Sequence, residues 1–377
     1  MPTVTSPRGT GPGSGRRPAW SGRVDDFWSR VTEGQTPAEM WRLFVTDARS
    51  SYRLYARDAS SGSAGRGVGR YAHLASDWFW AILTKLTPVR RLFLLAGLVF
   101  LALPREAADS SYPGLTRYGG MLILLVLVME LADRVIMKRD LEIAREIQQW
   151  LVPAAPPSLP SLDVAFTTRP ANTVSGDYYD VFPWSEAPRQ LIVMADVAGK
   201  SVPAALLMAT FHASLHSLAG NCATLIELVT GVNRYACAHS SQGRRFITAF
   251  LAVFDPESSS LTYINAGHNA PILRRASGAI ERLEAGGVPL GIVSREDYLP
   301  SSVALAPGDI LIVFTDGVVE ATNPAGQEFG DQRLLASVGP ECTGAAQMLQ
   351  FIMYNVDQFV RTAPQQDDIT CLVARRK

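Results

Sequence analysis

Cysteine is scarce in this chain, and its few cysteines form no pattern. Among 377 residues there are four, with no paired spacing: Cys222, Cys237, Cys342 and Cys371. We therefore predict reduced thiols in a cytoplasmic domain and not a disulfide framework. None of the four lies in a nucleophile motif, so we do not expect a covalent intermediate on cysteine.

Net charge is also absent. The 35 Lys and Arg residues balance 35 Asp and Glu residues, and without a basic excess we do not expect nucleic acid as a partner. Residues 1–22 are rich in Gly, Pro, Ser and Arg and lack the apolar segment of a signal peptide, so we predict a disordered tail there. The hydrophobic content of 47% is ample for a core, and the length allows two domains.

Four short acidic motifs are spread over roughly the last two hundred residues of the chain. Two of them follow apolar runs of strand length, Gln190–Met194 and Ile310–Phe314, and each run is followed by an aspartate. The motifs are Ser175–Asp180 (SGDYYD), Ala195–Lys200 (ADVAGK), Phe314–Gly317 (FTDG) and Gln366–Thr370 (QDDIT).

Aspartates at the ends of buried strands, beside small residues, are the oxygen ligands that a hard divalent cation requires. A buried carboxylate is costly unless it is paired, hydrogen-bonded or bound to a metal. The pattern therefore predicts metal-assisted chemistry on phosphate. The alternative is that Asp316-Gly317 is a plain turn and Asp367-Asp368 a solvated loop.

From about Leu141 to Lys377, some three-fifths of the chain, the sequence resembles the bacterial metal-dependent serine/threonine phosphatases of the SpoIIE and RsbU type, a branch of the phosphatase-2C-like fold. The resemblance rests on the acidic motifs and on further segments in the same order. These are Ile147–Pro153, Pro170-Ala171, Pro203–Leu206, Asn265–Pro271, Gly287–Gly291 and Asp316–Ala321.

The resemblance implies an α+β sandwich over residues 154–377, in which two mainly antiparallel β-sheets are flanked by helices. It also implies two Mn²⁺ or Mg²⁺ ions in the cleft between the sheets. The implied ligands are Asp196 as the bridge between the ions, the Val197 carbonyl, Asp316 and Asp367 on one ion, and Asp177 at the edge, bound directly or through water. Arg169 is a weak candidate for binding phosphate, and an ordinary exposed salt bridge is its alternative.

Three positions depart from the family pattern, because Ser175, Ala195 and Ser201 stand where many relatives have glycine. All three residues are small, so close approach of the backbone to a metal is preserved, but a positive φ at any of them would cost stability.

The implied activity is hydrolysis of phosphoserine or phosphothreonine on a bacterial signalling protein, with a phosphorylated anti-sigma-factor antagonist as the family's usual substrate. Two ions about 4 Å apart can share a water, lower its pKa and direct it at phosphorus. Two alternatives stay open. One is a catalytically inactive phosphatase-like module that binds a partner, and the other is a two-metal nucleotidyl cyclase, which also uses two aspartates and often a coiled linker.

A helix is predicted from Pro203 through Leu218, after the second acidic motif. His212 and His216 lie four residues apart on it and could share one face as metal ligands. No third ligand motif lies nearby in the sequence, so packing or surface roles are favoured for both.

The N-terminal region has a different organisation. Residues 23–89 are predicted to be helical, with a helix from Thr36 to Tyr55 that opens on a capping box and a Gly/Ser linker near 60–69. Two apolar runs without a polar face, 92–103 and 119–132, predict a transmembrane hairpin over 90–132. Flanking Arg and Lys residues would place both ends, and the catalytic domain, on the cytoplasmic side of the inner membrane. Each run is shorter than the ~20 residues that cross a bilayer comfortably, so a soluble helical domain in the cytoplasm is the alternative.

Residues 133–153 predict an amphipathic linker helix. Met137, Leu141, Ala144 and Leu151 approximate a seam that could pair with a second copy of the chain. We therefore expect a homodimer in which a signal changes the linker helices and thereby the metal site. The alternative is a single helix packed on its own catalytic domain.

Overall fold

The computed structural model describes residues 79–80, 83–103, 114–184, 188–199, 201–239, 245–284, 286–339 and 342–377. The predicted tail at 1–22, residues 23–78 with their predicted helix and Gly/Ser linker, and residues 104–113 between the two predicted membrane segments lie outside this set. The chain divides into two compact units, residues 1–131 and 132–377.

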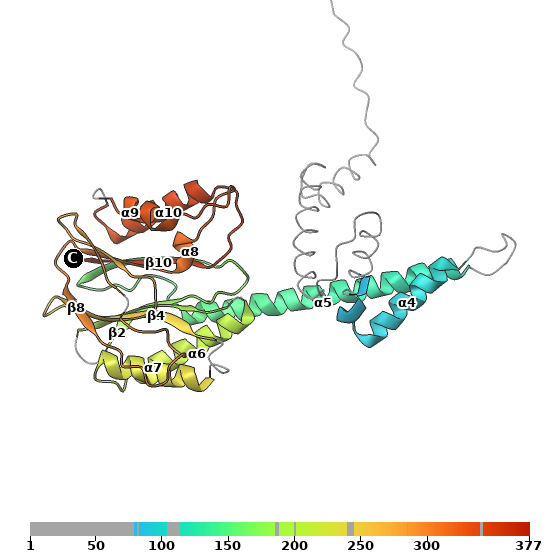
Figure 1. Ribbon diagram of the computed structural model, residues 1–377, viewed down its shortest axis with the longest axis horizontal. Helices are drawn as coiled ribbons and strands as arrows, with labels where there is room; N and C mark the ends of the chain where they lie inside the picture. Colours follow the sequence, from blue (N-terminus) through green and yellow to red (C-terminus); the bar gives the residue numbers. More distant parts are fainter. Residues whose placement is uncertain are drawn as a thin grey trace, which may run out of the picture. The chain divides into compact units, whose positions relative to one another are not determined.

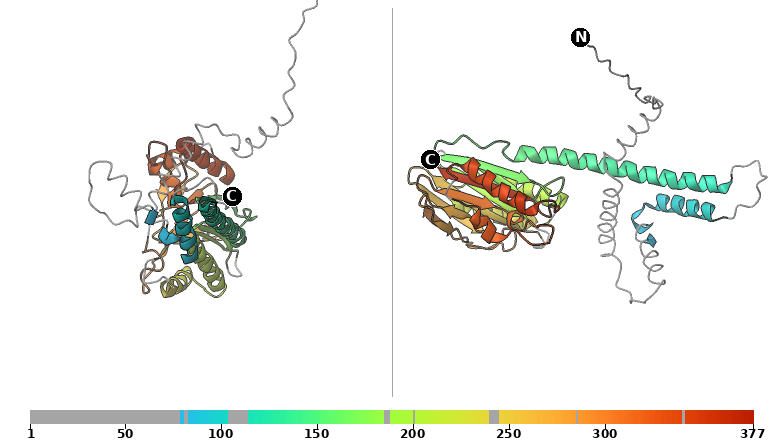
Figure 2. Two further views of the ribbon diagram at one scale, coloured as in Figure 1. Left: turned by 90° about the vertical axis from the view of Figure 1, so that its right-hand side faces the viewer. Right: turned by 90° about the horizontal axis from the view of Figure 1, so that it is seen from above.

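Two apolar helices pack against each other in the first unit. They are α4 (Pro88–Ala102) and the first part of α5 (Leu115–Leu151), seen side by side in Figure 2. A Cβ added to Gly119 would lie 2.7 Å from the carbonyl oxygen of Gly97, so only glycine allows the backbones to approach this closely. Arg90 pairs with Glu130, the charged residue of the 119–132 run, at 2.8 Å.

The predicted linker helix is the second part of α5, and no break separates it from the apolar run before it. Among the described helices, the one that is long and apolar enough by length and composition to cross a membrane is α6 (Val202–Ala219). Five of its residues belong to the core of the second unit, so α6 is a core helix. The predicted membrane segments 92–103 and 119–132 do not meet that criterion.

Residues 132–377 contain two five-stranded sheets with helices on their outer faces, as Figure 1 shows. The neighbouring strands pair in antiparallel fashion, in the orders β1-β10-β9-β6-β7 and β2-β3-β4-β5-β8. The strands are β1 (Leu162–Arg169), β2 (Tyr178–Pro183), β3 (Gln190–Val197), β4 (Ile247–Asp255), β5 (Ser260–Ala266), β6 (Ile272–Arg274), β7 (Ile280–Arg282), β8 (Ser301–Ala304), β9 (Ile310–Phe314) and β10 (Ile369–Arg376). The further helices are α7 (Leu225–His239), α8 (Asp316–Val319), α9 (Gly330–Ala336) and α10 (Ala345–Val360). The predicted sandwich is confirmed.

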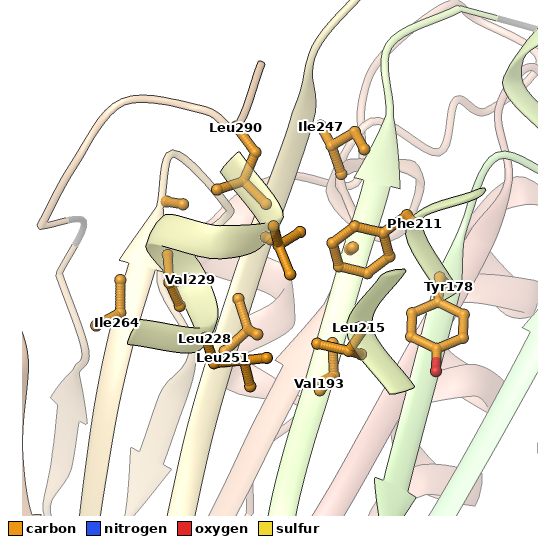
Figure 3. Packing of buried hydrophobic residues seen from close by; sticks show 14 of the residues in the cluster. Tyr178, Val193, Phe211, Leu215, Leu228, Val229, Ile247, Leu251, Ile264 and Leu290 are labelled. Atoms are coloured by element: carbon orange, nitrogen blue, oxygen red, sulfur yellow. The ribbon is translucent and has the colours of Figure 1, made fainter. Parts of the chain in front are cut away.

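Three apolar layers follow from the alternation of side chains along the strands. On β3, Ile192 and Met194 point between the sheets, whereas Leu191 and Val193 point outward beneath α6 and α7, a packing shown in Figure 3. A third layer joins the outer face of β9 and β10 to α9 and α10. A strand that is buried on both faces has apolar residues at successive positions. This explains why polar and apolar residues do not alternate in Gln190–Met194.

Two boundaries differ from the sequence-based expectation. β3 continues to Val197, so Asp196 lies within the end of the strand and pairs in register with Thr248. Asp316 is the first residue of α8, so the motif Asp316-Gly317 is the start of a short helix and not a plain turn.

Candidate metal centre

Asp177 stands where three acidic motifs meet. Its side chain is buried, and its Oδ2 accepts hydrogen bonds from the hydroxyls of Thr315, at 3.0 Å, and Thr370, at 2.5 Å. Thr315 precedes Asp316, and Thr370 lies three residues after Asp367. Asp177 precedes β2 in one sheet, whereas Thr315 follows β9 and Thr370 lies in β10 of the other. These bonds therefore join the two sheets at one end.

Asp196 brings a second carboxylate to this place. Burial, followed by the charges of Asp316 and Asp367, raises its pKa to about 7. Burial and the charge of Asp196 raise the pKa of Asp177 well above its ordinary value. Raised pKa values in neighbouring carboxyl groups mean that negative charge is concentrated here without enough compensation.

The residues at this site fit a hard divalent cation. The donors are carboxylate oxygens, which Mg²⁺ and Mn²⁺ prefer, and a cation would neutralise the repulsion that raises both pKa values. A Cβ added to Gly176 would lie 3.2 Å from the Val197 carbonyl oxygen, so glycine lets the loop before Asp177 pass close to that carbonyl. The five predicted ligand residues thus converge, and their roles as ligands remain our proposal.

Asp368 has a structural role that was not predicted from the sequence. Its carboxylate accepts hydrogen bonds from the backbone N–H groups of Ala171, at 2.7 Å, and Gly176, at 2.8 Å, and from the Ser175 hydroxyl, at 2.8 Å. It therefore holds the loop that carries Asp177. The adjacent Asp367 and Asp368 look alike in the sequence, and no signal there separates a ligand from a loop clamp.

Close packing against Asp368 requires a glycine at position 317. A Cβ there would lie 1.9 Å from the carbonyl oxygen of Asp368, a distance that no side chain tolerates. The glycine therefore allows the start of α8 to press against the segment that carries Asp367 and Asp368.

The end of α5 also contacts the Asp177 loop. The Gln148 amide donates to the carbonyl oxygen of Ser175 at 2.6 Å and accepts from its N–H at 2.9 Å. Gln148 belongs to the segment Ile147–Pro153, which carries part of the family resemblance, but no role for it could be predicted from the sequence. This pair of bonds is a direct route from the linker helix to the candidate metal centre.

The three departures from glycine have different consequences. Ser201 adopts a positive φ of 66° with ψ of −148°, a region that costs a non-glycine residue roughly 1–3 kcal/mol. Ser175 and Ala195 are not among the residues with positive φ. Ser175 uses its hydroxyl twice, since it donates to Asp368 and accepts from the Asp177 N–H at 3.0 Å.

Arg169 forms the salt bridge that was its alternative. It contacts both carboxylate oxygens of Asp357, at 2.5 and 3.1 Å. Both residues line a cavity of about 180 Å³ whose wall also includes Gly317 and Asp367. The cavity therefore adjoins the candidate metal centre, but the guanidinium is already paired with a carboxylate.

Comparisons with known proteins agree with this fold and these motifs. The family model described as stage II sporulation protein E matches residues 187–377. Phosphoserine phosphatase RsbU of Bacillus subtilis is 31% identical over 243 residues, which cover 64% of this chain and 71% of RsbU. Protein IcfG of Synechocystis is 28% identical over 263 residues, which cover 63% of this chain and 41% of IcfG. The chain thus spans less than half the length of that relative.

A solved structure shows the same architecture. The SiaA-PP2C domain of Pseudomonas aeruginosa superposes with a TM-score of 0.58 at 21% identity, covering 65% of this chain and 99% of that domain. Fold and motifs together define the class of phosphatase-2C-type serine/threonine phosphatases. Within that class, the chain belongs to the SpoIIE family.

Proposed function

We propose that this protein removes phosphate from a phosphoserine or phosphothreonine of a bacterial signalling protein in a metal-dependent reaction. The observation that carries the proposal is the convergence of Asp177, Asp196, Asp316 and Asp367 at one end of the two sheets. Relatives named as phosphoserine phosphatases support the choice of reaction. A phosphorylated anti-sigma-factor antagonist is the class of substrate that we propose.

Each residue would have a distinct role in metal binding. Asp196 would hold two Mn²⁺ or Mg²⁺ ions together, with the Val197 carbonyl, Asp316, Asp367 and Asp177 as the other ligands. When bound, the two ions supply an acidified water and positive charge beside the phosphoryl group. The chain positions these ligands through Thr315 and Thr370, which fix Asp177, and through Asp368, which fixes its loop.

The cavity beside Asp367 suits the substrate segment that flanks the phosphorylated residue. Its wall carries Glu320, Glu328 and Asp357 as well as Arg169, so it presents both signs of charge to a peptide. Arg169 would have to leave Asp357 before it could contact a phosphate, which makes it a poor anchor. A partner-binding module without activity is not favoured, because the four carboxylates are all in place.

The direct test is an assay of the purified chain with Mn²⁺ on a phosphoserine peptide and on a generic aryl phosphate. We expect turnover of both that depends on the metal and ceases with a chelator. Metal-independent inertness would favour the inactive module, and production of a cyclic nucleotide from a nucleoside triphosphate would favour the cyclase.

We also propose that two copies pair through the second part of α5, on a face that differs from the predicted one. Leu141 and Ala144 are half-buried within the chain, whereas Ile136, Ile143, Ile147 and Trp150 are exposed. Their spacing of 7, 4 and 3 residues forms one apolar stripe, as in a coiled-coil seam. A helix end that also contacts the Asp177 loop would transmit a change in pairing to the metal centre.

Replacing Ile143 and Ile147 with aspartate should convert the dimer to a monomer and change the turnover rate, because charges would be buried in the seam. Light scattering coupled to gel filtration of the full chain in detergent measures the first effect. The control is Arg145→Asp, on the exposed polar side of the same turn. An unchanged mass and rate in the double variant would reject the pairing.

For the first unit we propose membrane association, with the second unit in the cytoplasm. The helix pair exposes many large apolar side chains, among them Leu92, Val99, Met121, Leu124 and Leu127, and a water-soluble surface rarely carries so many together. We expect the full chain to remain with membranes after alkaline extraction. Replacing Gly119 with leucine should weaken this retention by separating the helices, and full release of the native chain into the aqueous phase would contradict the proposal.

A further inference from the structure

A group of two histidines and one aspartate lies apart from the four-carboxylate centre, between α6 and β2. His212 and His216 lie one turn apart on α6, and Asp180 lies on β2. One ligand atom from each residue lies within 4.8 Å of the other two. The Nε2 atom of His216 is 2.8 Å from Oδ2 of Asp180, and the two imidazole centroids are 4.4 Å apart. The fold thus supplies the third ligand that the sequence did not reveal.

Neighbouring side chains hold these three groups in place. The Tyr178 hydroxyl donates to Oδ2 of Asp180 at 2.8 Å and lies 3.1 Å from Nδ1 of His212. The Tyr178 ring itself is fixed beside Phe211 and Leu215 in the core (Figure 3). Phe182 stacks on the His216 ring, with centroids 4.3 Å apart. Hydrogen bonds and packing of this kind orient the ligands of metal sites in proteins.

The electrostatics and the exposure also suit a metal ion. Asp180 is buried, and burial followed by the nearby His216 lowers the pKa of His212, which favours the neutral imidazole that metals bind. The charged or titratable groups of the cluster are Asp180, Tyr178 and the two histidines. The His216 side chain is 37% exposed, so an ion can enter from solvent.

We propose that Asp180, His212 and His216 bind one divalent transition-metal ion of the zinc class. Two imidazole nitrogens and one carboxylate oxygen are ligands that zinc accepts, with a position left for water. Mg²⁺ and Mn²⁺ prefer oxygen ligands and would select the four-carboxylate centre instead. The ion would join α6, which follows the segment of Asp196 and Val197, to β2, which begins one residue after Asp177. The ion would therefore stabilise the positions of the two segments that carry Asp177 and Asp196.

The test is equilibrium dialysis of the full chain against Zn²⁺ with a competing chelator, with Asp196→Asn as the background so that the carboxylate centre competes less. We expect one tightly bound Zn²⁺. A further His216→Gln change should weaken that binding about 100-fold or more, because a direct ligand is lost and the loss of a ligand's outer partner alone costs about 10–100-fold. Glutamine keeps a hydrogen-bond donor beside Asp180, so the fold should persist, and thermal unfolding without metal checks this.

The matched control is His239→Gln, in the last turn of α7, whose Nδ1 lies 2.9 Å from the Tyr235 carbonyl oxygen. This variant should retain full Zn²⁺ affinity. Cobalt provides a second measurement, since the visible spectrum of bound Co²⁺ should change in the His216 variant alone, where one of the two nitrogen ligands is lost. Equal Zn²⁺ affinity in the His216 and His239 variants would overturn the proposal and leave the cluster as a hydrogen-bonded network. Because the variants share one background, this comparison stands whether or not the proposed phosphatase activity is found.

Discussion

Replacing Asp196 with asparagine should lower the turnover rate by about 10³-fold or more, the scale expected when a preorganised electrostatic element of a site is lost. Asp196 is the proposed ligand shared by both ions, so its loss affects both at once. Phosphopeptide hydrolysis under saturating Mn²⁺ measures the effect. The control is Asp297→Asn, an exposed carboxylate outside the four acidic motifs, which should keep the native rate. Near-native turnover in the Asp196 variant would refute the assignment.

The same substitution should change stability in a direction that depends on metal and pH. Without metal, the raised pKa of Asp196 means that the folded state binds a proton more tightly than the unfolded state does. The stabilisation is therefore complete below about pH 4, the ordinary pKa range of aspartate, and is lost as pH rises through about 7. We expect the unfolding free energy of the metal-free protein to fall across that window, and Asp196→Asn to flatten the fall.

Mn²⁺ should reverse this trend in the native chain, because a cation binds the deprotonated carboxylates and stabilises the folded state by mass action. The rise in melting temperature on adding Mn²⁺ should grow with pH and should be nearly absent in Asp196→Asn. An equal Mn²⁺ effect in both proteins would place the ions elsewhere.

Replacing Asp368 with asparagine should destabilise the folded protein by roughly 3 kcal/mol, because hydrogen bonds to a charged group contribute about 1.5–3 kcal/mol each. An asparagine has one acceptor oxygen where the aspartate uses two, so its NH₂ group would face either the Ala171 N–H or the Ser175 hydroxyl and Gly176 N–H together. Turnover should fall as well, because the loop that carries Asp177 loses its clamp. Urea unfolding in the presence of a chelator measures the stability directly.

Asp367→Asn is the control for this prediction, since it changes the neighbouring carboxylate of the same motif. As a proposed ligand, Asp367 should be needed for the Mn²⁺ effect and not for metal-free stability. Asp368→Asn should therefore lower the metal-free stability, whereas Asp367→Asn should remove the stabilisation by Mn²⁺. Equal metal-free stability in both would show that Asp368 is not the clamp.

Much of the catalytic unit could be predicted from local patterns. Apolar runs such as Ile310–Phe314 have the length and composition of buried strands, and β9 has those bounds. The acidic motifs predicted the chemistry that we propose, because a carboxylate buried at a strand end is costly unless it is paired, hydrogen-bonded or bound to a metal. The continuity of α5 was less accessible, because the change from an apolar run to a charged helix looks in the sequence like a boundary between elements.

By itself, the sequence determined the set of carboxylates and the family resemblance, since both depend on residue types at short spacing, and the resemblance in turn implied the sandwich. Only the tertiary structure decided which of two adjacent aspartates clamps the loop, that Gln148 reaches Ser175, and that Asp180 joins two histidines from another element. It also decided that Ser201 takes a positive φ. These features depend on contacts between residues distant in the chain or on backbone conformations that the fold imposes. Neither can be predicted from the local sequence.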